Sequence, residues 1–212
     1  MRNALYQNLE KTFDVALLPE GLLHDLAKEH GLTPGDLARD KSLYPIQRIR
    51  KASDILLDTT VDEERIVNML RAKLPAQRYW AAHACLYLGE EVIHKHLEAL
   101  NSLLKDPSRS VQIAAAEALA TYPAGAKGGE EALEVLLANA DPTKSSAYHA
   151  VAALNALDHQ PQKVLEPYKQ RITKLPTNDP DAPGRPNGYA ARMHKHITEP
   201  IPDTFSWEKN NR

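Results

Sequence analysis

The sequence predicts an all-α fold, specifically a right-handed α-solenoid (α-α superhelix) of stacked helix pairs. Two observations support this prediction. Residues 106–122 have apolar residues at helical spacing on more than one face, and shorter copies of the same pattern precede and follow this stretch. A helix that is small and apolar on several sides packs between neighbouring helices, and a repeat of such helices forms a stack.

Residues 106–122 predict the central inner helix. Asp106 is a suitable N-cap, and Pro107 suits the first helical position, where its missing amide hydrogen costs nothing. One apolar face recurs at i, i+3, i+4, i+7, i+8 and i+11: Val111, Ala114, Ala115, Ala118, Leu119 and Tyr122.

Two further segments match this helix. Residues 80–86 align with residues 113–119 at an offset of 33, and residues 151–157 align with them at an offset of 38. These spacings are typical of helical-pair repeats, in which one unit cannot bury its apolar face alone.

Three regions are predicted along the chain. Residues 1–43 lack the alanine pattern and form an N-terminal helical cap, with helices over 4–18, 19–31 and 35–40. Residues 44–175 form four helix pairs: 46–57 with 62–74, 75–88 with 91–104, 106–122 with 130–140, and 142–157 with 161–175. Residues 176–212 form a Pro-rich linker, one short helix over 188–198 and a polar tail.

Charge and composition exclude several classes of function. The net charge of −2 and pI near 6.5 give no electrostatic basis for nucleic-acid binding. A transmembrane helix requires about 18 or more consecutive apolar residues, and no such run is present, so we expect no membrane span. Cys85 is the only cysteine and replaces an alanine of the repeat, which predicts a small buried core residue.

We expect no metal site, cofactor site or catalytic residue. His94 with His96, and His194 with His196, are i, i+2 pairs, which point about 200° apart on a helix and cannot chelate one ion. The other histidines are scattered, and we expect His83 and His149 to be hydrogen-bonded packing residues: His24, His30, His83, His149 and His159. The Gly-rich turn at 125–129 lacks the phosphate-binding pattern and follows no strand.

The segment LLKDPSRSVQIAAAEAL (103–119) resembles a HEAT repeat, whose usual form is L-x-D-x-x-x-x-V-R-x-x-A-A-x-A-L, with Gln112 in place of the common arginine. More narrowly, residues 4–198 resemble the C-terminal HEAT-like extension of bacterial arylsulfatase-family proteins. The ordered segments that carry this resemblance are FDVALLPEGLLH (13–24), LTPGDLARD (32–40), YPIQRI (44–49), RYWAAHACLYLG (78–89), SVQIAAAEAL (110–119) and ALNALD (153–158).

The resemblance transfers no catalytic or metal-binding residue. The catalytic domain of those proteins, with its formylglycine nucleophile and calcium-binding carboxylates, is absent from these 212 residues. The segment 106–109 resembles the end of the sulfatase signature C/S-x-P-S-R, but Lys105 stands where the nucleophile must be. We interpret this segment as an inter-helix turn.

The resemblance implies a non-catalytic scaffold or accessory module that forms the C-terminal part of a sulfatase polypeptide. The alternative is a stand-alone HEAT-repeat module that binds another protein. A HEAT-type enzyme, such as a bilin lyase or an alkylpurine glycosylase, is a third interpretation, and the near-neutral charge argues against the glycosylase. The compartment is periplasmic or extracellular for a secreted sulfatase, and cytoplasmic if the chain is complete.

Overall fold

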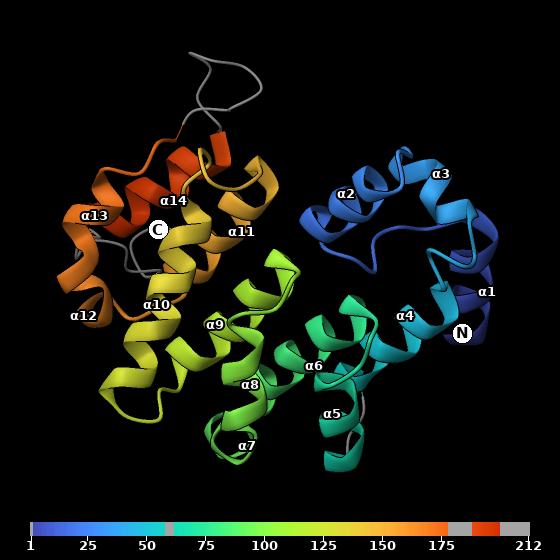
Figure 1. The fold of residues 1–212 in the computed structure, drawn as a ribbon, viewed down its shortest axis with the longest axis horizontal. Coiled ribbons are helices and arrows are strands. Elements are labelled where there is room, and N and C mark those ends of the chain that lie inside the picture. The colour runs from blue at the N-terminus through green and yellow to red at the C-terminus, as the bar shows by residue number, and fades with distance from the viewer. Residues whose placement is uncertain (1, 58–61, 178–187, 200–212) are drawn as a thin grey trace, which may run out of the picture.

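Paired helices stack along the chain in a computed structural model that describes residues 2–57, 62–177 and 188–199 (Figure 1). The inner helices α4 (Ile46–Ser53), α6 (Pro75–Leu88), α9 (Arg109–Thr121) and α11 (Ala147–Asp158) contact one another in this order. On the outer side lie α5 (Glu63–Leu70), α7 (Glu90–Lys95), α8 (Leu97–Leu103) and α10 (Ala126–Ala140). The predicted all-α solenoid is therefore confirmed.

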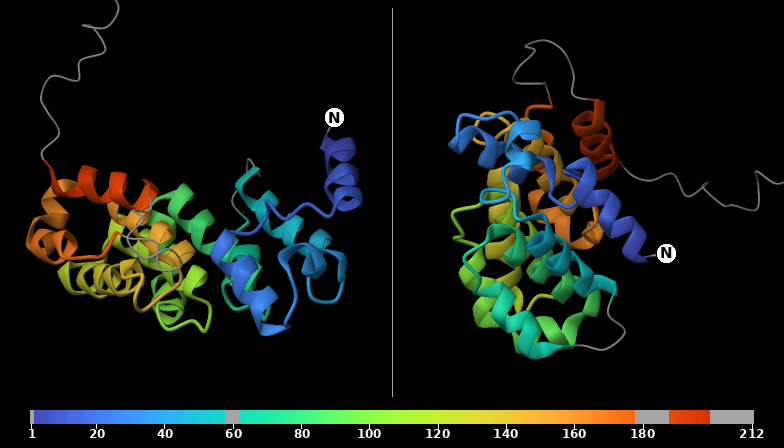
Figure 2. Two further views of the ribbon diagram at one scale, coloured as in Figure 1. Left: turned by 90° about the horizontal axis from the view of Figure 1, so that it is seen from above. Right: turned by 90° about the vertical axis from the view of Figure 1, so that its right-hand side faces the viewer.

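Further helices flank the stack at both ends (Figures 1 and 2). The N-terminal elements are α1 (Arg2–Thr12), α2 (Glu20–Glu29) and α3 (Pro34–Arg39), and a 3-10 turn, η1 (Asp54–Leu57), follows α4. The C-terminal elements are α12 (Gln162–Leu165), the 3-10 turn η2 (Glu166–Tyr168), α13 (Lys169–Thr173) and α14 (Gly188–Thr198). No helix in the described ranges is long and apolar enough to cross a membrane.

The alanines of the inner helices let the stack pack closely. In α9 the buried residues include Ala114, Ala115, Ala116, Ala118 and Ala120, and this helix contacts α6, α8, α10 and α11. Small side chains permit close approach of helices on several sides. The resulting core is continuous from α4 to α14, and a second, smaller core joins α2, α3, α4 and the first turn of α6.

The predicted start of the central helix is wrong. The helix α9 begins at Arg109, and its N-cap is Ser108, rather than Asp106 with Pro107 at the first helical position. The Asp106 carboxylate instead pairs with Arg78, at 2.6 and 2.9 Å, and accepts the Ser108 amide at 2.8 Å. This carboxylate therefore joins α6 to the turn before α9.

The predicted start of α11 is also too early. The helix begins at Ala147, not Pro142, and Ser146 caps it by accepting the His149 amide. The residues between Asp141 and α11 form a turn instead, because the Asp141 carboxylate accepts both the amide and the hydroxyl of Thr143.

Several outer elements also differ from the prediction. The segment 91–104 is two helices, since the His96 amide bonds to the carbonyls of both Val92 and Ile93 and ends α7. The segment 161–175 is interrupted at η2, where Pro167 lacks an amide hydrogen. In contrast, α10 begins earlier than predicted, at Ala126, directly after Gly125 with φ 80°.

A polar ladder connects consecutive turns along one edge of the stack. Gln112, the position where the repeat pattern has arginine, donates to the Asp106 carbonyl at 2.6 Å and accepts from Asn139 at 3.3 Å. Asn139 in turn accepts from Arg109 at 3.0 Å. The glutamine therefore keeps the connection between neighbouring turns without a second cation.

The position of α2 was not predicted. Its residues contact both α9 and α11, so the N-terminal segment crosses to the far inner helices (Figure 1). The carbonyl of Leu17, just before α2, accepts the indole N–H of Trp80 at 3.0 Å. The division into an N-terminal cap, four pairs and a C-terminal region stays a prediction, and residues 178–187 and 200–212 of the last region lie outside the described residues.

We expect Gly21→Ala to destabilise the fold. A Cβ at Gly21 would lie 2.6 Å from two ring atoms of buried His149, and overpacking of this kind costs about 1–3 kcal/mol. Chemical denaturation measures this loss. Gly128→Ala is the matched control, because a Cβ there meets nothing within 4 Å, and we expect it to be neutral or stabilising. Equal effects of the two substitutions would contradict the described contact between α2 and α11.

Candidate functional site

A cavity of about 490 Å³ opens on the face formed by the inner helices α6, α9 and α11. The start of α2 and one side of α14 complete its walls. Five elements from distant parts of the chain thus enclose one space. We call it the inner-face cavity.

The repeat register places equivalent residues in this cavity. The α9 residues on its wall fall at i, i+3, i+4 and i+7, which is one face of a helix: Ser110, Ile113, Ala114 and Glu117. At an offset of 38, all four positions recur on the wall from α11: Tyr148, Val151, Ala152 and Asn155. Two of the four positions stay apolar in both repeats, whereas the first changes from serine to tyrosine and the last from glutamate to asparagine, so the two repeats contribute different polar groups.

Aromatic residues of α6 form a second wall. Tyr79 and His83 are one helical turn apart, with ring centroids 4.5 Å apart in an edge-on arrangement. Tyr79 also packs edge-on against Trp80 at 5.3 Å, and Trp80 is anchored to the segment before α2. These rings are therefore held in place by the surrounding fold.

Glu117 brings a carboxylate into the apolar inner layer. The residue is only 8% exposed. One carboxylate oxygen, Oε1, lies 2.7 Å from Nδ1 of His159, and the other oxygen has no hydrogen-bond partner among the described residues. This second oxygen is not among the fully buried atoms that lack a partner, so water or a ligand donor can reach it.

Other polar side chains on the cavity wall also lack hydrogen-bond partners within the ranges that the structure describes. They supply hydroxyl, imidazole and amide groups: Tyr79, His83, Ser110, Tyr148 and Asn155. Tyr148 is 39% exposed, and Tyr79, His83 and Asn155 are partly exposed, so water solvates these groups in the free protein and a ligand can replace that water. Their convergence on one space is the feature expected of a binding site.

Burial also perturbs the titration of the α6 residues. It raises the pKa of Tyr79 to about 12, with a smaller contribution from the Glu117 charge. Burial lowers the pKa of His83, and the Glu117 carboxylate opposes part of this shift. At neutral pH both groups are uncharged, so Tyr79 offers a hydroxyl donor and His83 a neutral ring.

This shift predicts acid sensitivity. The pKa of His83 in the folded chain lies below its ordinary value of 6.5, because burial disfavours the charged ring. The contribution of His83 to the free energy of unfolding is therefore fully present above pH 6.5 and is lost as the pH falls below that value. Each unit of depression corresponds to about 1.4 kcal/mol. We expect His83→Phe to reduce the difference in unfolding free energy between pH 7 and pH 5, measured by urea denaturation. An unchanged difference would contradict the assigned protonation state.

Helix α2 holds the opposite wall. His149 is buried, its Nδ1 lies 2.8 Å from the Ser146 hydroxyl, and its Nε2 has no hydrogen-bond partner. Asp25 lies 3.4 Å from that Nε2, and burial lowers the pKa of His149 despite the aspartate charge. His24 stacks on Tyr148 with centroids 4.3 Å apart. These contacts fix the rim formed by Tyr148.

The structure supports part of the interpretation of the histidines. His149 is a buried, hydrogen-bonded residue as predicted, whereas His83 lines the cavity without a hydrogen bond among the described residues. His194 contacts the Ile172 carbonyl, and His196 pairs with Asp158. The described part of the chain has no group of three or more His, Cys, Asp or Glu side chains placed to hold a metal ion.

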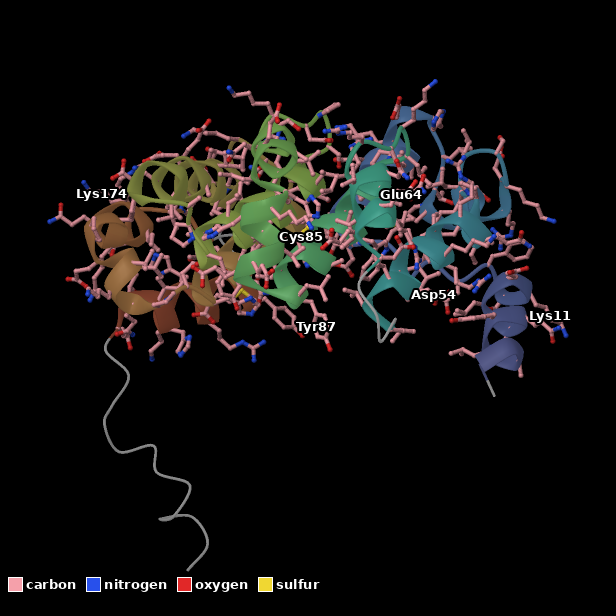
Figure 3. All side chains as sticks on the ribbon, turned by 90° about the horizontal axis from the view of Figure 1, so that it is seen from below. Lys11, Asp54, Glu64, Cys85, Tyr87 and Lys174 are labelled. Atoms are coloured by element: carbon pink, nitrogen blue, oxygen red, sulfur yellow. The ribbon has the colours of Figure 1, made fainter. Side chains whose placement is uncertain are left out.

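Cys85 is a packing residue in the interior of the stack, as predicted, and Tyr87 points outward from the same helix (Figure 3). Burial raises the pKa of the Cys85 thiol to about 12. A thiol in this state is a poor nucleophile at neutral pH.

The inner-face cavity was not predicted from the sequence. Glu117 is the only charged residue between Val111 and Thr121, and such a charge within an alanine-rich inner helix is a signal that could have indicated it. The contributions of α2 and α14 had no such signal, because contacts between distant segments leave no local pattern.

Comparison with known families agrees with the helical-repeat fold. A family model described as HEAT repeats matches residues 63–162, which extend from α5 to the start of α12. This stretch is a HEAT-repeat region. The HEAT-repeat region includes the walls of the cavity contributed by α6, α9 and α11. No curated protein and no solved structure matched the chain.

Proposed function

We propose that this HEAT-repeat module is a non-catalytic protein-binding module that holds a segment of its partner in the inner-face cavity. The observation that carries the proposal is the convergence of polar side chains without hydrogen-bond partners, among the described residues, on one preformed space. A volume near 490 Å³ is within the range of small binding sites, about 300–1,000 Å³. It suits one or two side chains of a partner.

The identity of the partner is a separate proposal. The resemblance of residues 4–198 to the arylsulfatase extension suggests a sulfatase domain, in the same polypeptide or as a second protein. The comparisons provide no support for this association. An in-frame C-x-P-S-R or S-x-P-S-R signature upstream of Met1 would support it, and an upstream stop codon would favour the stand-alone module.

Selection from a random peptide library tests the cavity. Peptides are selected on the wild-type chain and then compared on Ala152→Trp, which places an indole at an exposed position of the cavity wall. Ala138→Trp is the matched control, since Ala138 is an exposed alanine of α10 away from the cavity. We expect binding to survive the control and to be lost in Ala152→Trp. Equal binding to both variants, or no enrichment, would contradict the proposal.

The proposal that the module is non-catalytic is tested separately. We expect the purified chain to leave an aryl sulfate intact in the presence of calcium. Hydrolysis by this chain without a second protein would contradict it.

A further inference from the structure

The carboxylates of Glu20 and Glu117 lie on the wall of the inner-face cavity. Among the residues that the structure describes, this wall includes no lysine or arginine. Glu117 is the deeper of the two and has one carboxylate oxygen without a hydrogen-bond partner in the described ranges. A cationic group would therefore find an opposite charge in a partly desolvated place, where electrostatic attraction is stronger than in water.

Aromatic rings line the same cavity as this carboxylate. Tyr79, Tyr148 and Tyr189 reach the wall from α6, α11 and α14, and His83 adds a neutral ring. The faces of tyrosine rings attract ammonium and guanidinium groups. Arg192 of the chain itself already stacks on Tyr189, at 4.9 Å from the ring centroid, so the rings that remain for a ligand cation are those of Tyr79 and Tyr148.

We propose that the inner-face cavity receives one cationic side chain of the partner, the guanidinium of an arginine or the ammonium of a lysine. The charge lies at the unused oxygen of Glu117, and the hydrocarbon stem lies against Tyr79 and Tyr148. This inference rests on the proposed protein-binding function and specifies what that site recognises.

The cavity is preorganised for such a ligand. His159 engages one oxygen of Glu117 and so fixes the orientation of the carboxylate. Trp80 packs against Tyr79, and His24 stacks on Tyr148. Ligand binding then requires little additional ordering of these side chains, which favours affinity.

Four short peptides provide the test: Ac-GGXGG-NH2 with arginine, lysine, citrulline or glutamate at X. Citrulline has nearly the shape of arginine without its charge, so this comparison needs no change in the protein. Binding is measured by NMR, from the shifts of the His83 and Tyr79 ring signals during titration. We expect arginine and lysine peptides to bind, and citrulline and glutamate peptides to bind at least about tenfold more weakly.

Glu117→Gln provides the second arm. We expect it to weaken binding of the arginine peptide by about tenfold or more, whereas Glu134→Gln, an exposed residue of α10, has no effect. Equal affinity for arginine and citrulline, an unaffected Glu117→Gln variant, or no binding of either cationic peptide would overturn the inference. If library peptides without lysine or arginine still require an open cavity, the protein-binding function stands and only the cationic specificity is wrong.

Discussion

Arg78→Met is expected to lower the free energy of unfolding by about 3–5 kcal/mol, because it leaves the Asp106 carboxylate buried without its cation. The side chains of Arg78 and Asp106 are only 11% and 4% exposed. The guanidinium makes two bonds to the carboxylate, at 2.6 and 2.9 Å, and also donates to the carbonyls of Ala72 and Lys73. One side chain therefore joins α6, the turn after α5 and the turn before α9. Denaturation in urea measures the loss.

The control for this prediction is an exposed pair with the same chemistry. Arg171 and Glu134 pair at the surface, with side chains that are 54% and 51% exposed. Exposed pairs contribute at most about 1 kcal/mol, so we expect a small effect of Arg171→Met. Similar losses in the two variants would contradict the structural role assigned to Arg78.

Leu119→Ala is expected to cost about 2–5 kcal/mol, since it opens a cavity at the centre of the stack. Leu119 is 1% exposed and belongs to α9, which contacts helices on both sides along the solenoid. Thermal or chemical unfolding measures the effect. Leu57→Ala is the matched control, because Leu57 is 58% exposed, and we expect a change within about 0.5 kcal/mol. A Leu119→Ala variant as stable as the control would exclude α9 as the central packing helix.

The parts of the fold that were predicted correctly are those encoded by local periodicity. Helix α6 occupies 75–88 and α14 occupies 188–198, as predicted, because their ends carry clear signals such as Pro75 and Gly89. The starts of α9 and α11 were placed too early. Asp106 and Asp141 resemble N-caps in sequence, but their carboxylates bind groups of the preceding turn and, for Asp106, a distant arginine.

The candidate site was only partly available from sequence for the same reason. The spacing of Ser110, Ile113, Ala114 and Glu117 indicates one helix face, and the offset of 38 identifies the matching face on α11. Nothing local indicates that α2 packs against α11 through Gly21 and His149. The cavity exists because a segment outside the repeat closes over an inner face of the solenoid.

The most direct test of the account is a crystal structure of the chain bound to a peptide selected from the library. We predict a peptide side chain inside the inner-face cavity, with its polar end at Glu117 and its stem between Tyr79 and Tyr148. A peptide bound across the outer helices α5, α8 and α10, with the cavity filled only by water, would contradict the account.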